Sequence, residues 1–418
     1  MEQGRARQRA VLSRAAGPQR RHRPDYVLIM LMLMLLLIGL IVIYSISPGL
    51  SVHRHVSENY YVGKQLLAVG LGAATFTIMS LIPLNFWQRI QRPLIIGSVV
   101  ATLIALVTPI SPDYPAHRWI RFGDFSFQSV ELIKFAIIFV LSTFLVERMR
   151  KGDLHDLKVT MKPLAIVVLI LGLVVAKFQS DLGSMAVMVA MIVAMCYVAG
   201  VPLKRLAIAG AIIALLGVLA ISTTAYRRDR LLSFLHPEQN CQTASGYQAC
   251  QALIAVGSGG VIGKGLGQSV QAYGYLPEAA NDSIFAIYAE KFGFVGGVTL
   301  VCLFLALFTR LKNIMERAAD HYSRLVVTGV LAWFSTQAVI NIGAMVGLLP
   351  LKGITLPFIS YGGTSIIFVT AAVGLVYNIS RYTTYGVNTD LDKAGQPAMV
   401  ADSSLRGRIV SGGMRGVR

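Results

Sequence analysis

The sequence predicts an all-α integral membrane protein with about ten transmembrane helices. Three observations support this fold class. Of the 418 residues, 55% are hydrophobic and only 14% are charged, whereas soluble domains carry roughly a quarter charged residues. The mean hydropathy is +0.63. Apolar runs long enough to cross a bilayer, which takes about 20 residues, recur along the whole chain. This composition excludes an ordinary soluble protein.

The predicted spans begin and end where polar residues interrupt the apolar runs. They lie at residues 27–46, 64–84, 93–110, 129–146, 163–177, 182–200, 204–225, 284–309, 325–349 and 363–380. Only a short polar break, Gln179–Gly183, separates the fifth span from the sixth. Joining those two into one bent span would break the alternation of basic segments, so we keep them separate.

Lysine and arginine are unevenly distributed between the spans, and this sets the predicted orientation. The formal net charge is +18. Because most of the basic residues fall between apolar runs, we interpret them as topology signals and not as a nucleic-acid site. The Arg-rich start of the chain, the segments 148–162 and 310–324, and the end after Arg381 all fall on one side. Both termini are therefore predicted to be cytoplasmic.

The same pattern divides the chain into regions. Residues 1–25 are predicted to form a basic cytoplasmic tail, and residues 26–382 a polytopic membrane domain. Residues 383–418 are rich in Gly and Ser and are predicted to be a disordered cytoplasmic tail. A large extracytoplasmic loop, about 226–283, lies between the seventh and eighth spans.

Charged side chains inside or beside the spans mark a candidate site, because an ionisable group in a bilayer is costly unless it faces protein or water. Glu131 and Lys134 are three residues apart and can pair on one face of a helix. Lys177 and Asp181, four residues apart, are predicted as a structural ion pair. Arg118 is either an interfacial anchor or a clamp for a lipid-linked phosphate.

The large loop carries further candidates. Arg227 and Arg228 lie on the side where the positive-inside rule disfavours arginine, which suggests contact with a pyrophosphate or anionic headgroups. A surface cluster that compensates nearby acidic residues is the alternative. Cys241 and Cys250 could form a disulfide in this oxidising location. The glycine-rich stretch 257–269 does not match a nucleotide-binding loop, and its backbone is expected to approach a ligand closely.

Asp282 is the leading candidate for a catalytic residue. It lies where the polar stretch LPEAANDS enters the eighth span. A carboxylate in a partly desolvated mouth, near cations that hold a phosphate, suits a general base. The alternative is an N-cap, a common role of aspartate at a helix start. Lys352, in the last exterior segment, is available as a further cation.

Several motifs together resemble the SEDS family (shape, elongation, division and sporulation), which includes RodA and FtsW. The matching stretches are HRWIRFG, QSVELIK, QSDLG, GYQACQALIAVGSGG, GKGLGQSVQAYGYLPEA, NIGAMVGLLPLKG and LPFISYGGTS. They lie between the first predicted span and the last, and exclude only the tails. The PEA after Leu276 and the LKG before the final LP resemble FtsW more than RodA, which favours a role at the division septum.

The resemblance implies a glycosyltransferase in the bacterial inner membrane that polymerises lipid II. Such an enzyme forms β-1,4 bonds and releases undecaprenyl pyrophosphate. The resemblance also implies a class B penicillin-binding transpeptidase and other division proteins as partners. Asp282 matches the family's required aspartate, and Arg118, Glu131 and Lys134 match residues of its central cavity. The family's usual His-Thr-Asp-Phe is Ala-Asn-Asp-Ser here, so the carboxylate is present while its neighbours differ.

Three alternatives stay open at this point: an elongation polymerase like RodA, a lipid II flippase with Asp282 as its gate, and a division scaffold. In the polymerase, the leaving pyrophosphate would be stabilised by Arg118 and Lys134, with Arg227, Arg228 and Lys352 as further cations. A divalent cation, Mg²⁺ or Mn²⁺, could share this role, although the sequence identifies no cluster of metal ligands.

Overall fold

The structure is a computed structural model. It describes residues 24–109, 117–122, 125–222, 233–235, 241–242 and 244–382. The second predicted tail and nearly all of the first lie outside these residues, as do Arg227 and Arg228. The predictions for these parts therefore stay predictions.

The described chain is mostly helical, as the sequence predicts. Its long helices are α2 (Tyr26–Arg54), α3 (Tyr60–Leu81), α5 (Gln91–Val107), α6 (Ser129–Lys151), α8 (Leu182–Ala199), α9 (Leu203–Ser222), α12 (Ala244–Ser258), α13 (Ile284–Glu316), α14 (His321–Met345) and α15 (Gly363–Ser380). The shorter elements are α4 (Leu84–Arg89), α7 (Lys162–Leu171), the π-helical segments η1 (Leu157–Met161), η2 (Gly172–Phe178) and η3 (Gln271–Tyr275), and the strands β1 (Trp119–Phe122) and β2 (Phe125–Gln128).

The helices account for each of the predicted spans. Eight helical segments among the described residues are long and apolar enough to cross a membrane, and α7 with its flanking π-helical turns is one of them. The shorter apolar helix α5 coincides with the third predicted span, and α9 coincides with the seventh. The chain is therefore a multi-pass helical membrane protein, while the count of about ten crossings stays a prediction.

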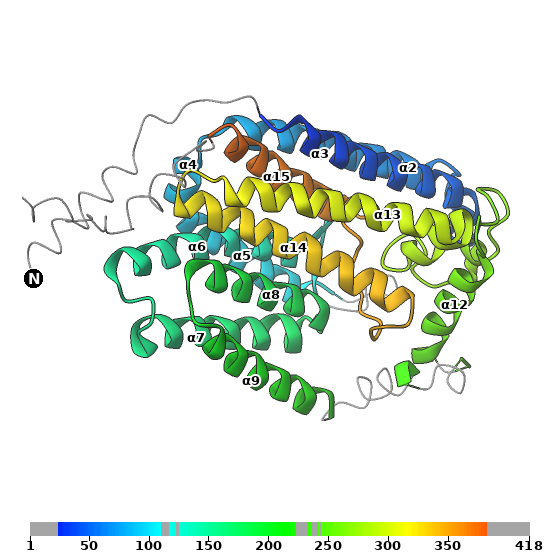
Figure 1. The fold of residues 1–418 in the computed structure, drawn as a ribbon. Helices are drawn as coiled ribbons and strands as arrows, with labels where there is room; N and C mark the ends of the chain where they lie inside the picture. Colours follow the sequence, from blue (N-terminus) through cyan, green and yellow to red (C-terminus); the bar gives the residue numbers. More distant parts are fainter. Residues whose placement is uncertain are drawn as a thin grey trace, which may run out of the picture. The chain divides into compact units, whose positions relative to one another are not determined.

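Helix α15 lies in the interior of the described bundle, and nearly all of its side chains are buried. It packs against α3 along its length and also contacts α2, α6 and α14 (Figure 1). Small residues allow the close approach to α3. A methyl group on Gly374 would lie 2.5 Å from the carbonyl oxygen of Phe76. Close backbone contact at a small residue is typical of helix packing in membranes.

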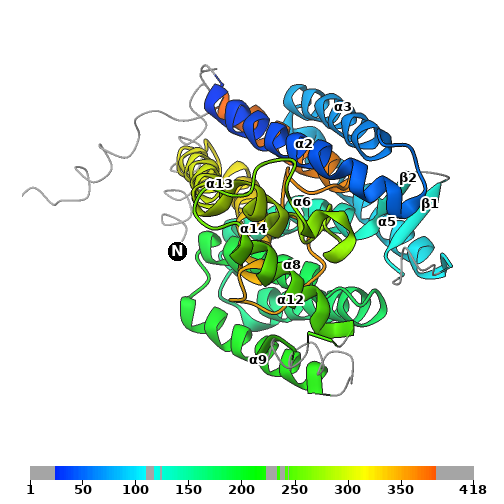
Figure 2. The ribbon, with the colours of Figure 1, turned by 90° about the vertical axis from the view of Figure 1, so that its right-hand side faces the viewer.

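The two ends of the bundle are built differently. At one end, Asp25 caps α2 by accepting from the backbone N–H of Leu28 at 3.1 Å, and it pairs with Arg310 of α13 at 2.6 Å. At the other end, β1 and β2 form an antiparallel hairpin in which Trp119 faces Gln128, and α6 begins at the next residue. Figure 2 looks onto this second end, which we call the hairpin end.

The glycine-rich stretch packs on α13, and the expectation that its backbone approaches a ligand stays a prediction. Gly293, with φ at 65°, interrupts the helix. The freed N–H of Phe294 donates to the carbonyl of Gly260 at 2.9 Å. The carboxylate of Glu290, which is 0% exposed, accepts from Lys264 at 3.3 Å and from Ser269 at 2.5 Å. The glycines therefore allow one backbone to lie against another.

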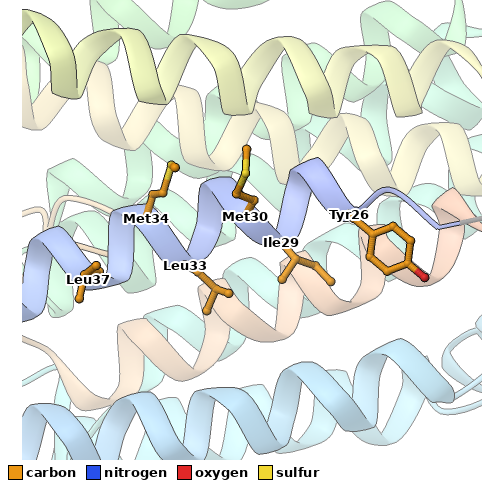
Figure 3. Close-up of a pocket in the computed structure, with 6 residues that line it drawn as sticks. All are labelled: Tyr26, Ile29, Met30, Leu33, Met34 and Leu37. Atoms are coloured by element: carbon orange, nitrogen blue, oxygen red, sulfur yellow. The ribbon is translucent and has the colours of Figure 1, made fainter.

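A shallow apolar groove runs along the outer face of α2. Figure 3 shows its lining side chains, which are Tyr26, Ile29, Met30, Leu33, Met34 and Leu37. The groove offers no charged group that could act on a substrate. In a bilayer, exposed apolar side chains of this kind are matched by lipid chains, which are equally apolar.

Replacing Gly374 with alanine should destabilise the bundle, because the added methyl group would clash with the backbone of Phe76. We expect a loss of about 1–3 kcal/mol, the usual cost of overpacking a filled interior, seen as a lower thermal midpoint in detergent. Gly70→Ala in α3 is the matched control, because a methyl group there meets no heavy atom within 4 Å. Equal midpoints for the two variants would contradict the described α3–α15 contact.

Candidate functional site

The backbone that carries Asp282 is held at three successive carbonyl oxygens, those of residues 280–282. The first accepts from the backbone N–H of Tyr361 at 2.8 Å, and the second from the hydroxyl of Ser360 at 2.6 Å. The third accepts from the side-chain amide of Asn341 at 2.7 Å. The donors belong to α14 and to the loop before α15, so two distant parts of the chain fix the position of Asp282.

The side chain of Asp282 is half-buried at the hairpin end. Its Oδ1 accepts from the amide Nε2 of Gln248 at 3.4 Å. The expectation that Asp282 could be an N-cap is wrong, because α13 begins at Ile284 and its N-cap is Ser283. The carboxylate is therefore not used to cap the helix that follows it.

Arg118 is turned towards the interior by the hairpin. Its carbonyl accepts from the N–H of Ser129 at 3.3 Å, which fixes β1 to the start of α6. Its guanidinium pairs with Asp181 at 3.3 Å, and the side chain is 21% exposed. A methyl group on the exposed Gly353 would lie 3.9 Å from Arg118 Nη1 and 3.7 Å from Asp282 Oδ2. The predicted base and the predicted cation thus both lie within 4 Å of the position that a methyl group on Gly353 would take.

Lys352 belongs to the same loop as Gly353. It is half-buried, and a methyl group on Gly183 would lie 3.3 Å from its Cβ. The loop that follows α14 therefore rests on the start of α8, near Asp181. Three predicted site residues that are distant in sequence, Asp282, Arg118 and Lys352, come together around this loop.

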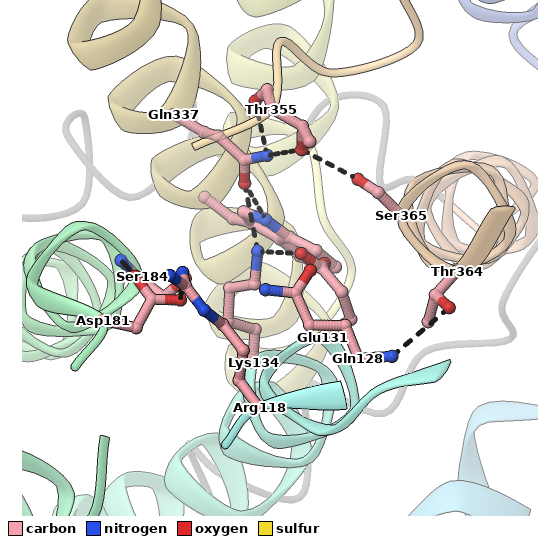
Figure 4. A network of polar contacts seen from close by, with 11 residues as sticks. Arg118, Gln128, Glu131, Lys134, Asp181, Ser184, Gln337, Thr355, Thr364 and Ser365 are labelled. Atoms are coloured by element: carbon pink, nitrogen blue, oxygen red, sulfur yellow. Dashed lines mark hydrogen bonds and ion pairs between the residues drawn. The ribbon is translucent and has the colours of Figure 1, made fainter. Parts of the chain in front are cut away.

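At the start of α6, Lys134 and Glu131 form a buried ion pair at 2.7 Å, with side-chain exposures of 2% and 3% (Figure 4). Lys134 also donates to the amide oxygen of Gln337 at 3.1 Å and lies 4.8 Å from the ring centre of Trp333. Gln337 in turn donates to the carbonyl of Thr355 at 2.8 Å. A chain of polar contacts thus connects α6 through α14 to the loop that carries Lys352.

Some buried oxygens near this network have no hydrogen-bond partner within the described part of the chain. They are Glu131 Oε2, Gln179 Oε1 and Asn341 Oδ1. An unpartnered oxygen costs free energy inside an apolar bundle. These positions are where a polar group of a bound substrate, or water, would be favourable.

The predicted ion pair between Lys177 and Asp181 is wrong. Asp181 pairs with Arg118 and accepts from the hydroxyl of Ser184 at 2.8 Å, while Lys177 is exposed. The prediction rested on the four-residue spacing around the polar break. The π-helical segment η2 ends at Phe178, and Ser180 takes a left-handed conformation with φ at 53°. The two residues therefore do not share a helix face.

The structure joins Cys241 and Cys250 by a disulfide, with Cα atoms 5.4 Å apart. The bond connects the chain just before α12 to the first turns of that helix. Cys196 and Cys302, the other two cysteines, are free thiols. Both cysteines lie in the large loop, and the disulfide predicted from that location is present.

The uncharged polar residues of the site were not predicted from the sequence. Gln337 and Asn341 are four residues apart on α14, so they lie on one face and both point to the loop before α15. Amide side chains in an otherwise apolar span are a usable signal, because they need partners inside the bundle. Gln248 gives no such signal, because it lies in the polar loop and only the fold brings it to Asp282.

Among the described residues, no three or more His, Cys, Asp or Glu side chains lie close enough together to hold a metal ion. The site therefore consists of a half-buried carboxylate, adjacent cations and a buried polar network beneath them. The divalent cation considered from the sequence stays a prediction.

Fold and site together define a multi-pass membrane protein with paired charges in its interior and a carboxylate at one end of the bundle. The chain belongs to the FtsW/RodA/SpoVE family of cell cycle proteins, whose model matches residues 26–385. The match covers the whole described bundle and most of the chain.

Curated relatives are similar over nearly their full length. Stage V sporulation protein E of Bacillus subtilis is 35% identical over 371 residues, which is 87% of this chain and 98% of the relative. A protein named probable peptidoglycan glycosyltransferase FtsW, from Thioalkalivibrio, is 38% identical over 366 residues, which is 86% of this chain and 90% of the relative.

Solved structures share the fold. A chain from a study of how a peptidoglycan synthase complex coordinates polymerization and crosslinking aligns with a TM-score of 0.70 and 24% identity, covering 86% of this chain and 98% of that chain. The rod shape determining protein RodA of Thermus thermophilus aligns with a TM-score of 0.60 and 24% identity, covering 86% of this chain and 98% of that chain.

Lys134→Met should destabilise the protein strongly, because it leaves the carboxylate of Glu131 buried without its cation. Breaking a buried pair in this way typically costs about 3–5 kcal/mol, measured here as a large drop in the thermal midpoint. Lys177→Met is the matched control, since Lys177 is exposed and should tolerate the change. If Lys177→Met were as damaging as Lys134→Met, the corrected pairing would be refuted.

Titration of the unreduced, denatured protein with a thiol reagent should find two free thiols, those of Cys196 and Cys302. Cys241 and Cys250 should react only after reduction. Four free thiols before reduction, in protein purified without reductant, would exclude the disulfide.

Proposed function

We propose that the chain is a peptidoglycan glycosyltransferase that polymerises lipid II into glycan strands during cell division. Its family membership and the names of its relatives support this activity. The FtsW-type relatives favour a division role over the elongation role of RodA. The Thioalkalivibrio FtsW is 38% identical in sequence to this chain, and the Thermus thermophilus RodA is 24% identical. The substrate and the inner-membrane location follow from the same proposal.

The observation that carries the proposal is the placement of Asp282. Its backbone is fixed by donors from α14 and the following loop, while its side chain stays half-buried and accessible. Arg118 approaches the same glycine, Gly353, as the carboxylate does, and Lys352 is the residue before that glycine. A fixed carboxylate next to cations is the arrangement needed to deprotonate a hydroxyl while an adjacent phosphate leaves.

The proposed reaction is one displacement at an anomeric carbon. Asp282 removes the proton from the 4-hydroxyl of the acceptor sugar, and that oxygen attacks the anomeric carbon of the donor strand. The bond from the anomeric carbon to the pyrophosphate breaks, and its electron pair leaves with undecaprenyl pyrophosphate. The new bond is β-1,4, formed with inversion, and the proton stays on the carboxylate until solvent accepts it.

The other predicted residues take different parts in this step. Arg118 and Lys352 are placed to stabilise the leaving pyrophosphate. Lys134 and Glu131, predicted as substrate-binding, are buried and paired with each other, and Lys134 also donates to Gln337. We assign Lys134 to the support of the site, whereas Glu131 Oε2, which has no hydrogen-bond partner among the described residues, stays a candidate for contact with the substrate. Arg227 and Arg228 lie outside the described residues, and their contact with the pyrophosphate is part of the proposal.

The proposed partner is a class B penicillin-binding transpeptidase, together with other division proteins. The solved structure that concerns a peptidoglycan synthase complex supports such a pairing. In this arrangement the hairpin end faces the cell exterior, both termini are cytoplasmic, and the complex acts at the division septum. Coupling to a transpeptidase would deliver each new strand directly to the enzyme that crosslinks it.

Asp282→Asn should abolish glycan polymerisation from lipid II by the purified protein with its transpeptidase partner. The amide cannot accept the proton, and loss of a general base typically costs about 10²- to 10⁴-fold in rate. The product is measured as polymer resolved by length. Glu278→Gln is the matched control, because this exposed carboxylate lies in the same turn and should be dispensable.

Undiminished polymerisation by Asp282→Asn, at normal membrane abundance, would reject Asp282 as the base. No polymer from any variant despite an intact complex would instead favour a flippase or a scaffold. Transport of fluorescent lipid II across vesicles would then separate those two.

A further inference from the structure

Gln248 is the side chain that connects the large loop to the proposed base. It lies on α12, and its Nε2 is 3.4 Å from Asp282 Oδ1 and 3.0 Å from the hydroxyl oxygen of Ser283. The hydroxyl of Ser283 donates to the carbonyl of Pro277 at 2.9 Å, so its oxygen is an acceptor for Gln248. A carboxylate is also an acceptor. The two acceptors fix the nitrogen, and not the oxygen, of the amide towards Asp282.

Helix α12 is held firmly enough to place this amide. Its first turns are fixed by the Cys241–Cys250 disulfide, and Cys250 is two residues from Gln248. At its far end, the hydroxyl of Ser258 contacts Glu290 at 3.5 Å. Figure 2 shows α12 at the hairpin end, and the helix packs against both α13 and α14. The disulfide that supports Gln248 is separate from the three groups that donate to the backbone of residues 280–282.

We propose that Gln248 is a positioning residue, which orients the carboxylate of Asp282 and keeps it ionised for proton transfer. This inference rests on the proposed function of Asp282. The backbone contacts from α14 and the loop before α15 set where the residue sits. The amide of Gln248 contacts the carboxylate itself, and a hydrogen bond donated to a carboxylate favours its charged form.

The test uses the purified protein in complex with its transpeptidase partner, and measures the rate of lipid II polymerisation against substrate concentration and pH. Gln248→Ala should lower kcat by about tenfold with little change in KM, as expected for the loss of one hydrogen bond to a charged group. The acidic limb of its pH–rate profile should move to higher pH, because the carboxylate becomes easier to protonate.

Gln248→Glu is the second variant. It keeps the size of the side chain, removes the N–H donor and adds a negative charge beside Asp282, so the acidic limb should move further than in Gln248→Ala. Gln251→Ala is the matched control, because this residue has the same side chain, lies on the same helix and makes no hydrogen bond to Asp282 among the described contacts. The thermal midpoint of each complex reports on folding.

Asp282→Asn, measured in the same experiment, distinguishes a failure of the inference about Gln248 from a failure of the proposed function. If it is inactive while Gln248→Ala matches Gln251→Ala in rate and pH profile, the role of Gln248 is rejected and the proposed function stands. If Gln248→Ala only lowers the thermal midpoint and leaves the pH profile unmoved, Gln248 is structural and the inference is also rejected. Full activity of Asp282→Asn would overturn the proposed function itself.

Discussion

Two ion pairs, Lys134 with Glu131 and Arg118 with Asp181, hold charge inside a bundle whose interior is mainly apolar. Much of the described architecture depends on them. An unpaired charge in this environment is expensive, so every element that carries one must be placed against its counterpart. The hairpin brings Arg118 to the break before α8, and α6 carries both Lys134 and Glu131. Both ion pairs therefore lie at the hairpin end of the bundle.

Polar contacts then extend from these pairs to the proposed base. Gln337 connects Lys134 to the loop before α15, and Asn341, one helical turn further on, connects the same loop to Asp282. One face of α14 thus supports both the buried pair and the carboxylate. Such an arrangement favours a preorganised site, because the groups are already oriented before substrate arrives. The side chain of Asp282 is half-buried, so its carboxylate can be reached by a substrate.

The site was only partly predictable from the sequence. Glu131 and Lys134 stand out because charged residues are rare in spans, and Arg118 and Asp282 stand out because they lie just outside spans, at the mouth of the bundle. The pairing of Glu131 with Lys134 also followed from helical spacing. The pairing of Asp181 with Lys177 did not hold, because spacing predicts contact only within a continuous helix and the chain turns at Ser180. Local periodicity cannot reveal a partner that comes from another segment.

Composition and hydropathy by themselves determined that this chain is a multi-pass helical membrane protein, because backbone groups in lipid must be satisfied within each span. Distinctive motifs determined its family. Only the tertiary structure decided which polar groups meet. Gln248 and Ser360 give no signal in the sequence, yet together with Asn341 they contact Asp282 and its backbone neighbours once α12, α14 and the loop before α15 converge. Burial is a property of each segment, whereas a hydrogen bond between distant segments depends on how all of them pack.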